Sequence, residues 1–159
     1  RLHLQANATV NLDPLGFRGA RVDLEVVKRD MNVIDPFTGL NRPFSYDQEG
    51  SFEIDFRHDV PGTDWAWGAN LDHFDQAPYA RRFEIGREWE GKVFGSLFIE
   101  HKDVLGLTVR ARANNLLGAR DYFRRTVFDG PRPEGAVRFE EYRSRRIGPI
   151  FRLTVSGDF

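Results

Sequence analysis

The sequence contains no cysteine, a single methionine among 159 residues and almost no excess of charge of either sign. Without cysteine the chain has neither a disulfide scaffold nor a thiolate metal site, which is compatible with an oxidising periplasm or cell surface. A formal net charge of -1 provides no global field that would attract nucleic acid. We therefore expect no nucleic-acid partner.

Long apolar runs are also missing. Mean hydropathy is -0.51, and no stretch approaches the ~20 apolar residues of a spanning helix. This excludes a helical membrane protein but leaves a β-barrel open, because barrel strands are only half apolar. The chain starts at Arg1 without a basic and apolar leader, so we expect a piece of a longer protein whose native N-terminus lies upstream.

Apolar and polar residues alternate along most of the chain, with little helical periodicity. Alternation at a period of two places the two kinds of side chain on opposite faces of a strand. Phe94 and Phe98 are the clearest interruptions of this pattern. The pattern predicts an all-β, antiparallel up-and-down meander of about seven strands. The expected strands are residues 2–13, 20–29, 51–59, 65–74, 82–101, 107–114 and 137–159.

The predicted connections alternate between short and long. Short turns with Pro, Gly and Asp are expected at 13–19, 60–64 and 102–106, and longer segments at 30–50, 75–80 and 118–136. Short turns on one side and long loops on the other are typical of transmembrane barrels, with the short turns in the periplasm. The last strand should therefore end at Phe159 on the periplasmic side. Because bacterial barrels have an even number of strands, we expect at least one further strand upstream.

Two readings of the alternating faces are possible. In a membrane barrel the apolar face meets lipid and the polar face lines the lumen, with Trp65 and Trp67 in an interfacial girdle. In a soluble all-β ligand-binding module, either a sandwich or a small barrel, the apolar face forms the core. A complete small barrel with an unrecognised eighth strand is a third possibility. The residues expected to form the polar wall are Arg21, Asp23, Glu25, Glu53, Asp55, Arg57, Asp72, Arg110 and Arg112.

Three motifs stand out in the last third of the chain: Asn114 to Gly118 ends one strand, Phe128 to Arg132 lies in a loop, and Arg145 to Leu153 leads into Ser156 to Phe159. Together they resemble the C-terminal strands of TonB-dependent outer-membrane receptors. The segment from Asp35 to Pro43 is similar to an outer loop of that family. The terminal strand signature consists of Phe151, Leu153, Val155 and Phe159.

This resemblance implies a barrel of about 22 strands with a plugged lumen. Such a receptor imports a scarce nutrient, either an iron chelate, a cobalamin or an oligosaccharide, with energy from the TonB system. Residues 1–159 are then the C-terminal part of the barrel without its plug domain, located in the bacterial outer membrane. The implied partners are outer-membrane lipid and lipopolysaccharide, the barrel assembly machinery through the last strand, the TonB system through the missing plug, and an unidentified small molecule.

The sequence gives little support for catalysis. The four histidines lie on different predicted strands, and no phosphate-binding loop or nucleophile motif occurs, so we expect no enzyme activity, metal or cofactor. Ligand contact is expected in the long loops, which carry aromatic and cationic groups. These residues are Phe37, Arg42, Tyr79, Arg81, Tyr122, Arg124 and Arg125.

A separate prediction concerns lipid. Arg143 and Arg145 share parity with Phe159, and Arg145 lies 14 residues before it. At ~3.3 Å per residue and a tilt near 40°, this corresponds to roughly 35 Å of height, above an apolar band of ~25 Å. Arg143 and Arg145 are therefore expected on the outer surface, at the level of lipopolysaccharide phosphates. The alternative is that they meet water or pair with Glu141.

Overall fold

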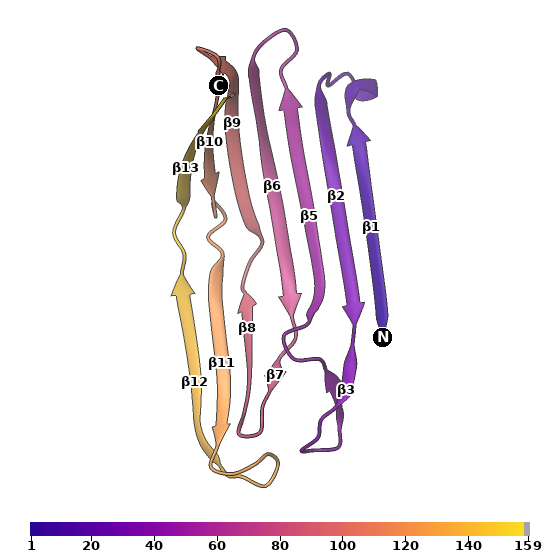
Figure 1. Ribbon diagram of the computed structural model, residues 1–159, viewed down its shortest axis with the longest axis vertical. Coiled ribbons are helices and arrows are strands. Elements are labelled where there is room, and N and C mark those ends of the chain that lie inside the picture. Colours follow the sequence, from indigo (N-terminus) through magenta and orange to yellow (C-terminus); the bar gives the residue numbers. More distant parts are fainter. Residues whose placement is uncertain (158–159) are drawn as a thin grey trace.

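The computed structural model describes residues 1–157 and is all-β, with one short 3-10 helix, Asp13–Leu15. Figure 1 shows the strands side by side in a tall, open sheet. The strands are β1 (Leu2–Asn11), β2 (Ala20–Asp30), β3 (Asn32–Ile34), β4 (Asn41–Pro43), β5 (Gln48–Asp59), β6 (Trp65–Gln76), β7 (Tyr79–Ala80), β8 (Glu84–Glu90), β9 (Phe94–Val104), β10 (Leu107–Asn114), β11 (Arg120–Phe128), β12 (Val137–Arg146) and β13 (Ile150–Ser156).

The main sheet has seven antiparallel strands in the order β1-β2-β5-β6-β9-β10-β13. A second sheet has the order β12-β11-β8-β7, and β3 and β4 form a small hairpin. The last three predicted strands pass through both sheets, because β9 continues β8, β11 continues β10 and β13 continues β12. Seven strand-length segments therefore run up and down in sequence order, as the alternation predicts. Residues 1–157 do not close into a barrel, since β1 and β13 are opposite edges of the main sheet.

Four strands lie in segments predicted as loops: the short β3, β4 and β7, and the longer β11. The sequence pattern predicts a loop over residues 118–136, but Arg120–Phe128 is β11 and pairs with both β8 and β12. Only residues 129–136 form the connection between β11 and β12. Strand β11 was hidden because its apolar residues are divided between both faces, so neither face reads as apolar.

The two ends of the sheet differ as predicted. The turns between β1 and β2, β5 and β6, and β9 and β10 gather at one end (top of Figure 1), together with the end of β13. The connections through β3 and β4, through β7, and between β11 and β12 lie at the other end, which we call the long-loop end. Phe159 lies outside the described residues.

The three long strands break in one row, at residues 91–93, 115–119 and 147–149. Hydrogen bonds from the Gly91 N–H to the Arg120 carbonyl and from the Leu116 N–H to the Gly95 carbonyl carry the pairing across this row. Asn115 is fully buried there at φ +55°, a backbone conformation that asparagine tolerates better than most residues. Its side chain donates to the carbonyls of Ala119 and Ile147 and accepts the N–H of Ala119. Asn115 therefore satisfies the backbone groups that the break releases.

The break changes which residues share a face. Leu97 pairs with Ala113, and Glu90 pairs with Asp121. Leu97 and Glu90 are an odd number of positions apart, so they lie on opposite faces. Their partners Ala113 and Asp121 also lie on opposite faces but are an even number of positions apart, which regular alternation would place on one face. One residue of β10–β11 is therefore inserted at the break, as in a β-bulge, and the alternation shifts by one.

The main sheet has one apolar and one polar face. The register aligns Trp67, Ile99, Ala111 and Leu153 across four strands of the apolar face. On the polar face it aligns Thr9, Asp23, Asp55, Asn70 and Ser96.

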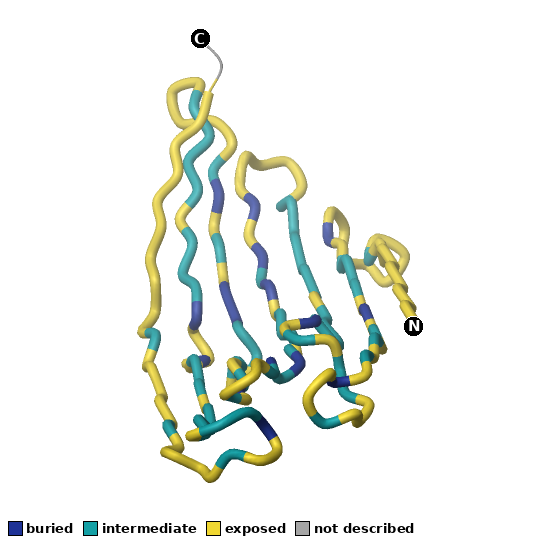
Figure 2. Tube along the Cα trace, turned by 60° about the horizontal axis from the view of Figure 1, so that its bottom comes forward, coloured by how far each residue is buried: buried dark blue, intermediate teal, exposed yellow. Residues whose placement is uncertain are grey.

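No second layer covers either face within residues 1–157. Four of the six buried hydrophobic residues are alanines, whereas Phe151 and Leu153 are 78% and 70% exposed. Figure 2 shows single buried residues along the central strands among exposed and half-buried ones, without a continuous core. No helix in the described part of the chain is long and apolar enough to cross a membrane.

Candidate functional site

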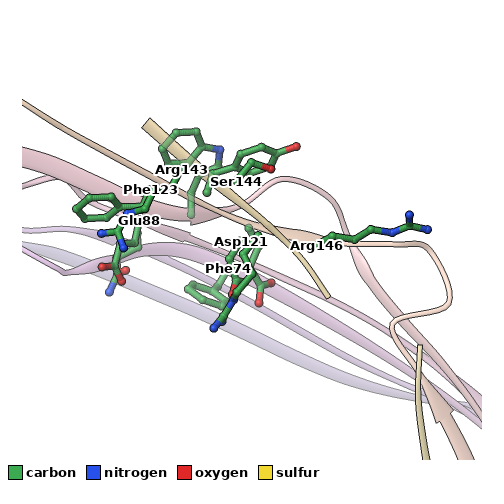
Figure 3. Close-up of a pocket in the computed structure, with 12 residues that line it drawn as sticks. Phe74, Glu88, Asp121, Phe123, Arg143, Ser144 and Arg146 are labelled. Carbon is green, nitrogen blue, oxygen red and sulfur yellow. The ribbon is translucent and has the colours of Figure 1, made fainter. Parts of the chain in front are cut away.

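A large cavity lies on the polar side of the second sheet, next to the row of strand breaks and in the half of the molecule that carries the long loops. It has a volume of about 890 Å³ and is bounded by β6, β8, β11 and β12. We call it the long-loop pocket. Figure 3 shows the residues that line this pocket, among them Phe74, Glu88, Asp121, Phe123 and Arg143. Its walls also include Gln76, Trp89, Glu90, Tyr122, Ser144, Arg145 and Arg146.

The pocket combines aromatic rings with charges of both signs. Arg143 stacks its guanidinium on Phe123, 4.3 Å from the ring centroid, and pairs with Glu141 at 2.9 Å. Arg145 pairs with Asp121. Glu88 makes no ion pair among the described residues and is exposed. Such a wall offers ring faces, a free carboxylate and guanidinium groups to a polar organic ligand.

Arg143 and Arg145 therefore do not face outward, and the lipid-facing prediction for them is wrong. Arg145 pairs with Asp121, while Phe151 on the same chain segment pairs with Ala113 of the apolar face. The break at residues 147–149 shifts the alternation between β12 and β13. Arg145 and Phe151 therefore lie on opposite faces, although both have odd residue numbers. Gly148-Pro149 was the sequence signal for this break.

A network of ion pairs occupies the polar face of the main sheet toward the short-turn end. Glu100 accepts from Arg57 and lies 2.8 Å from Arg110, and Arg57 also pairs with Asp59 at 2.9 Å. The Phe98 ring lies between the two arginines, with their Cζ atoms 5.7 Å and 4.2 Å from its centroid. Phe98 interrupts the sequence pattern because it belongs to this polar wall, where Gly68 leaves space for its ring.

On the rest of the polar face, acidic residues of neighbouring strands lie directly opposite one another. Asp23 lies opposite Asp55, and Glu25 lies opposite Glu53, which in turn lies opposite Asp72. Asn70 donates to Glu53 and Asp55 at 3.0 Å. Like charges directly opposite one another destabilise a sheet, so this acidic stripe is a cost to folding that a wet surface would reduce.

A buried cluster joins the long loops. Asp35 is 2% exposed and accepts from Arg42 and Arg132, each at 2.9 Å. Arg132 also donates to the carbonyl of Arg81 at 2.7 Å. Burial raises the pKa of Asp35, but the Phe37 N–H and the two arginines outweigh it and lower the pKa to about 2. We call Asp35, Arg42 and Arg132 the loop cluster; it links the β3–β4 hairpin to the connection between β11 and β12.

The residues predicted for ligand contact do not form one site. Arg42 is bound to Asp35, and Tyr79 is 3% exposed beneath Tyr46, with ring centroids 5.0 Å apart. Phe37 and Arg81 remain exposed near the long loops, as predicted.

The other three ligand-contact residues lie on β11 and not in a loop. Arg125 lies on the polar side, where it pairs with Glu84 and Glu141. Tyr122 lies on the opposite side, stacked on Trp89 at 5.4 Å and on Tyr142 at 6.2 Å. Arg124 shares that side, because it alternates with Arg125. Five pocket residues could not be grouped from the sequence, because the hidden strand and the shifted alternation removed the signal: Phe74, Glu88, Glu90, Asp121 and Phe123. Asp35 and Arg132 could not be paired from the sequence because they lie far apart in the chain.

The histidines are separated as the sequence suggests. Asp72 lies on the polar face, whereas His73 packs against Phe52 on the other face, with ring centroids 6.1 Å apart. Within residues 1–157, no three His, Cys, Asp or Glu side chains come close enough to hold a metal ion.

Comparison of the chain with family models, with curated proteins and with solved structures gives no significant match. The functional argument therefore depends on the geometry of the two faces.

Proposed function

We propose that this chain forms part of the wall of an outer-membrane β-barrel, with its apolar face toward lipid and its polar face toward a water-filled lumen. The observation that carries the proposal is the single-layer sheet whose apolar face is exposed, with Phe151, Leu153 and Val155 on an edge strand. A soluble domain of this size buries most of its apolar side chains between layers. Lipid would cover the same surface without a second layer.

The ends of the sheet support a direction for this wall. Short turns gather at one end and long connections at the other, so the long-loop end is assigned to the cell exterior. The aromatic residues Trp65 and Trp67, at 47% and 42% exposure, lie near the short turns, where an interfacial girdle belongs.

We further propose that the barrel is that of a TonB-dependent receptor that imports a scarce nutrient, either an iron chelate, a cobalamin or an oligosaccharide. The resemblance of residues 114–118 and 145–153 to that family motivates this assignment. The long-loop pocket supplies a plausible capture surface, since it opens on the lumen side near the exterior end and offers stacking rings and charged groups.

Membrane fractionation tests the barrel proposal. The protein should sediment with outer-membrane markers, resist extraction by alkaline carbonate and dissolve only with detergent. A monomer in detergent-free buffer would instead support the soluble ligand-binding module.

Uptake assays with labelled iron chelates, cobalamin and oligosaccharides test the transport assignment: import of one of them should require both this protein and TonB. Import of none of these compounds, or import that persists without TonB, would contradict that assignment.

A further inference from the structure

Two arginines stand directly opposite each other on the outward side of the second sheet. Arg120 of β11 pairs with Arg146 of β12, and both are exposed. They alternate with Asp121 and Arg145, which bind each other on the polar side, so Arg120 and Arg146 point the other way. Figure 3 shows the Arg146 side chain extending away from the pocket residues.

Neither arginine has an acidic partner among residues 1–157, although most other strand arginines do. Like charges in directly opposite positions of a sheet repel each other. Two adjacent, unpaired guanidinium groups form a fork suited to a phosphate group.

The arginine pair adjoins an apolar groove. Ala111 and Ala113 form its floor, Leu97 and Ile99 one side, and Phe151 with Leu153 the other, enclosing about 550 Å³. The rims are half or more exposed, from 51% at Leu97 to 78% at Phe151. Small residues between larger ones on two neighbouring strands leave a shallow channel along β10, which ends at Ala113 before the break.

The surroundings of the pair change from apolar to aromatic. Leu116 and Leu117 lie between the groove and the arginines, with exposures of 42% and 50%. Beyond the arginines stand the stacked rings of Trp89, Tyr122 and Tyr142. Arg146 and Phe151 are separated by roughly 17 Å of extended strand, so a single amphiphile could reach both.

We propose that Arg120 and Arg146 bind the phosphate of a lipopolysaccharide molecule whose acyl chain lies in the alanine groove. This inference rests on the proposed barrel, because the groove must face the outer leaflet. Charge complementarity selects a phosphorylated amphiphile, and the long-loop end places the pair in the leaflet where lipopolysaccharide resides. This phosphate site differs from the one predicted from sequence alternation, which consisted of Arg143 and Arg145.

The test is the amount of lipopolysaccharide retained by the protein after extraction from outer membranes in mild detergent, measured by native mass spectrometry. Removing both charges with Arg120→Gln and Arg146→Gln should lower retention about tenfold or more, because the phosphate loses its charge-assisted hydrogen bonds to both guanidinium groups. Arg152→Gln is the matched control, since Arg152 is exposed on the polar face of β13 and should leave retention unchanged.

Two further arms identify the ligand. Ala113→Phe should fill the groove and lower retention while leaving both arginines in place. Lipopolysaccharide stripped of its phosphates should bind the wild type and the double variant equally. The proposal is overturned if the double variant retains as much phosphorylated lipopolysaccharide as Arg152→Gln, or if inorganic phosphate alone accounts for binding. All variants must first fractionate with the outer membrane; wild-type protein found elsewhere contradicts the barrel and not this site alone.

Discussion

At the scale of single residues, Asn115 has the most demanding position in the fold. Its side chain makes hydrogen bonds of 3.1, 2.6 and 2.7 Å to backbone groups of Ala119 and Ile147, and it is completely buried. Unsatisfied buried polar groups are costly, whereas exposed ones recover water. The row of strand breaks therefore depends on one amide side chain.

Asn115→Ala should lower the free energy of unfolding by about 3 kcal/mol, because it leaves buried backbone groups without partners. Asn114→Ala is the control, since that side chain makes one long bond of 3.3 Å to the Ile150 carbonyl. Urea-induced unfolding of the lipid-reconstituted protein measures both. Equal losses in the two variants would show that Asn115 has no special role.

Asp35 makes the loop cluster sensitive to acid. Its pKa lies at about 2, below the ordinary value of 3.8, so the stabilisation that it contributes is complete above pH 3.8 and is lost as the pH falls toward 2. The protection factors of the amide hydrogens in residues 31–47 and 129–136 should fall across this range. Asp35→Asn should exchange quickly at all pH values, and wild-type protection that persists at pH 2 would contradict the assignment.

At the scale of strands, the alternation predicts the faces correctly on β1, β2, β5, β6, β10 and β13 but not beyond the breaks. Ala111 and Leu153 share a face as expected. Arg143 and Arg145 do not share it, because the inserted backbone at 147–149 shifts the alternation. Periodicity carries no information across a bulge, so a sequence can define each strand and still misplace the residues that follow a break.

The outward assignment of β13 gives a prediction about insertion. Val155→Arg should cost up to about 2 to 4 kcal/mol if this position lies near the bilayer midplane, and less near an interface. Thr154→Arg adds the same charge to the polar face and should cost much less. Folding into lipid vesicles, followed by urea titration, compares the two; identical stabilities would refute the lipid-facing assignment.

At the scale of the whole molecule, the all-β class, the up-and-down order of seven long segments and the contrast between short turns and long loops could be predicted from sequence, whereas β3, β4, β7 and β11 could not. These features depend on local alternation and turn chemistry. The long-loop pocket and the loop cluster could not, because they bring together residues such as Asp35 and Arg132, which are 97 positions apart. Which of these distant residues come into contact depends on the strand register and on the positions of the breaks.

The central claim is that one face of this sheet meets lipid and the other meets water. The absence of native cysteine allows single cysteines to be placed without background labelling. Spin labels at Leu97, Ala111, Leu153 and Val155 should collide with oxygen dissolved in the bilayer, and labels at Ser96, Arg112, Arg152 and Thr154 with a water-soluble nickel chelate. The account predicts this alternation in the reconstituted protein. Apolar positions shielded from both reagents, with no change on adding lipid, would indicate a soluble core and would contradict it.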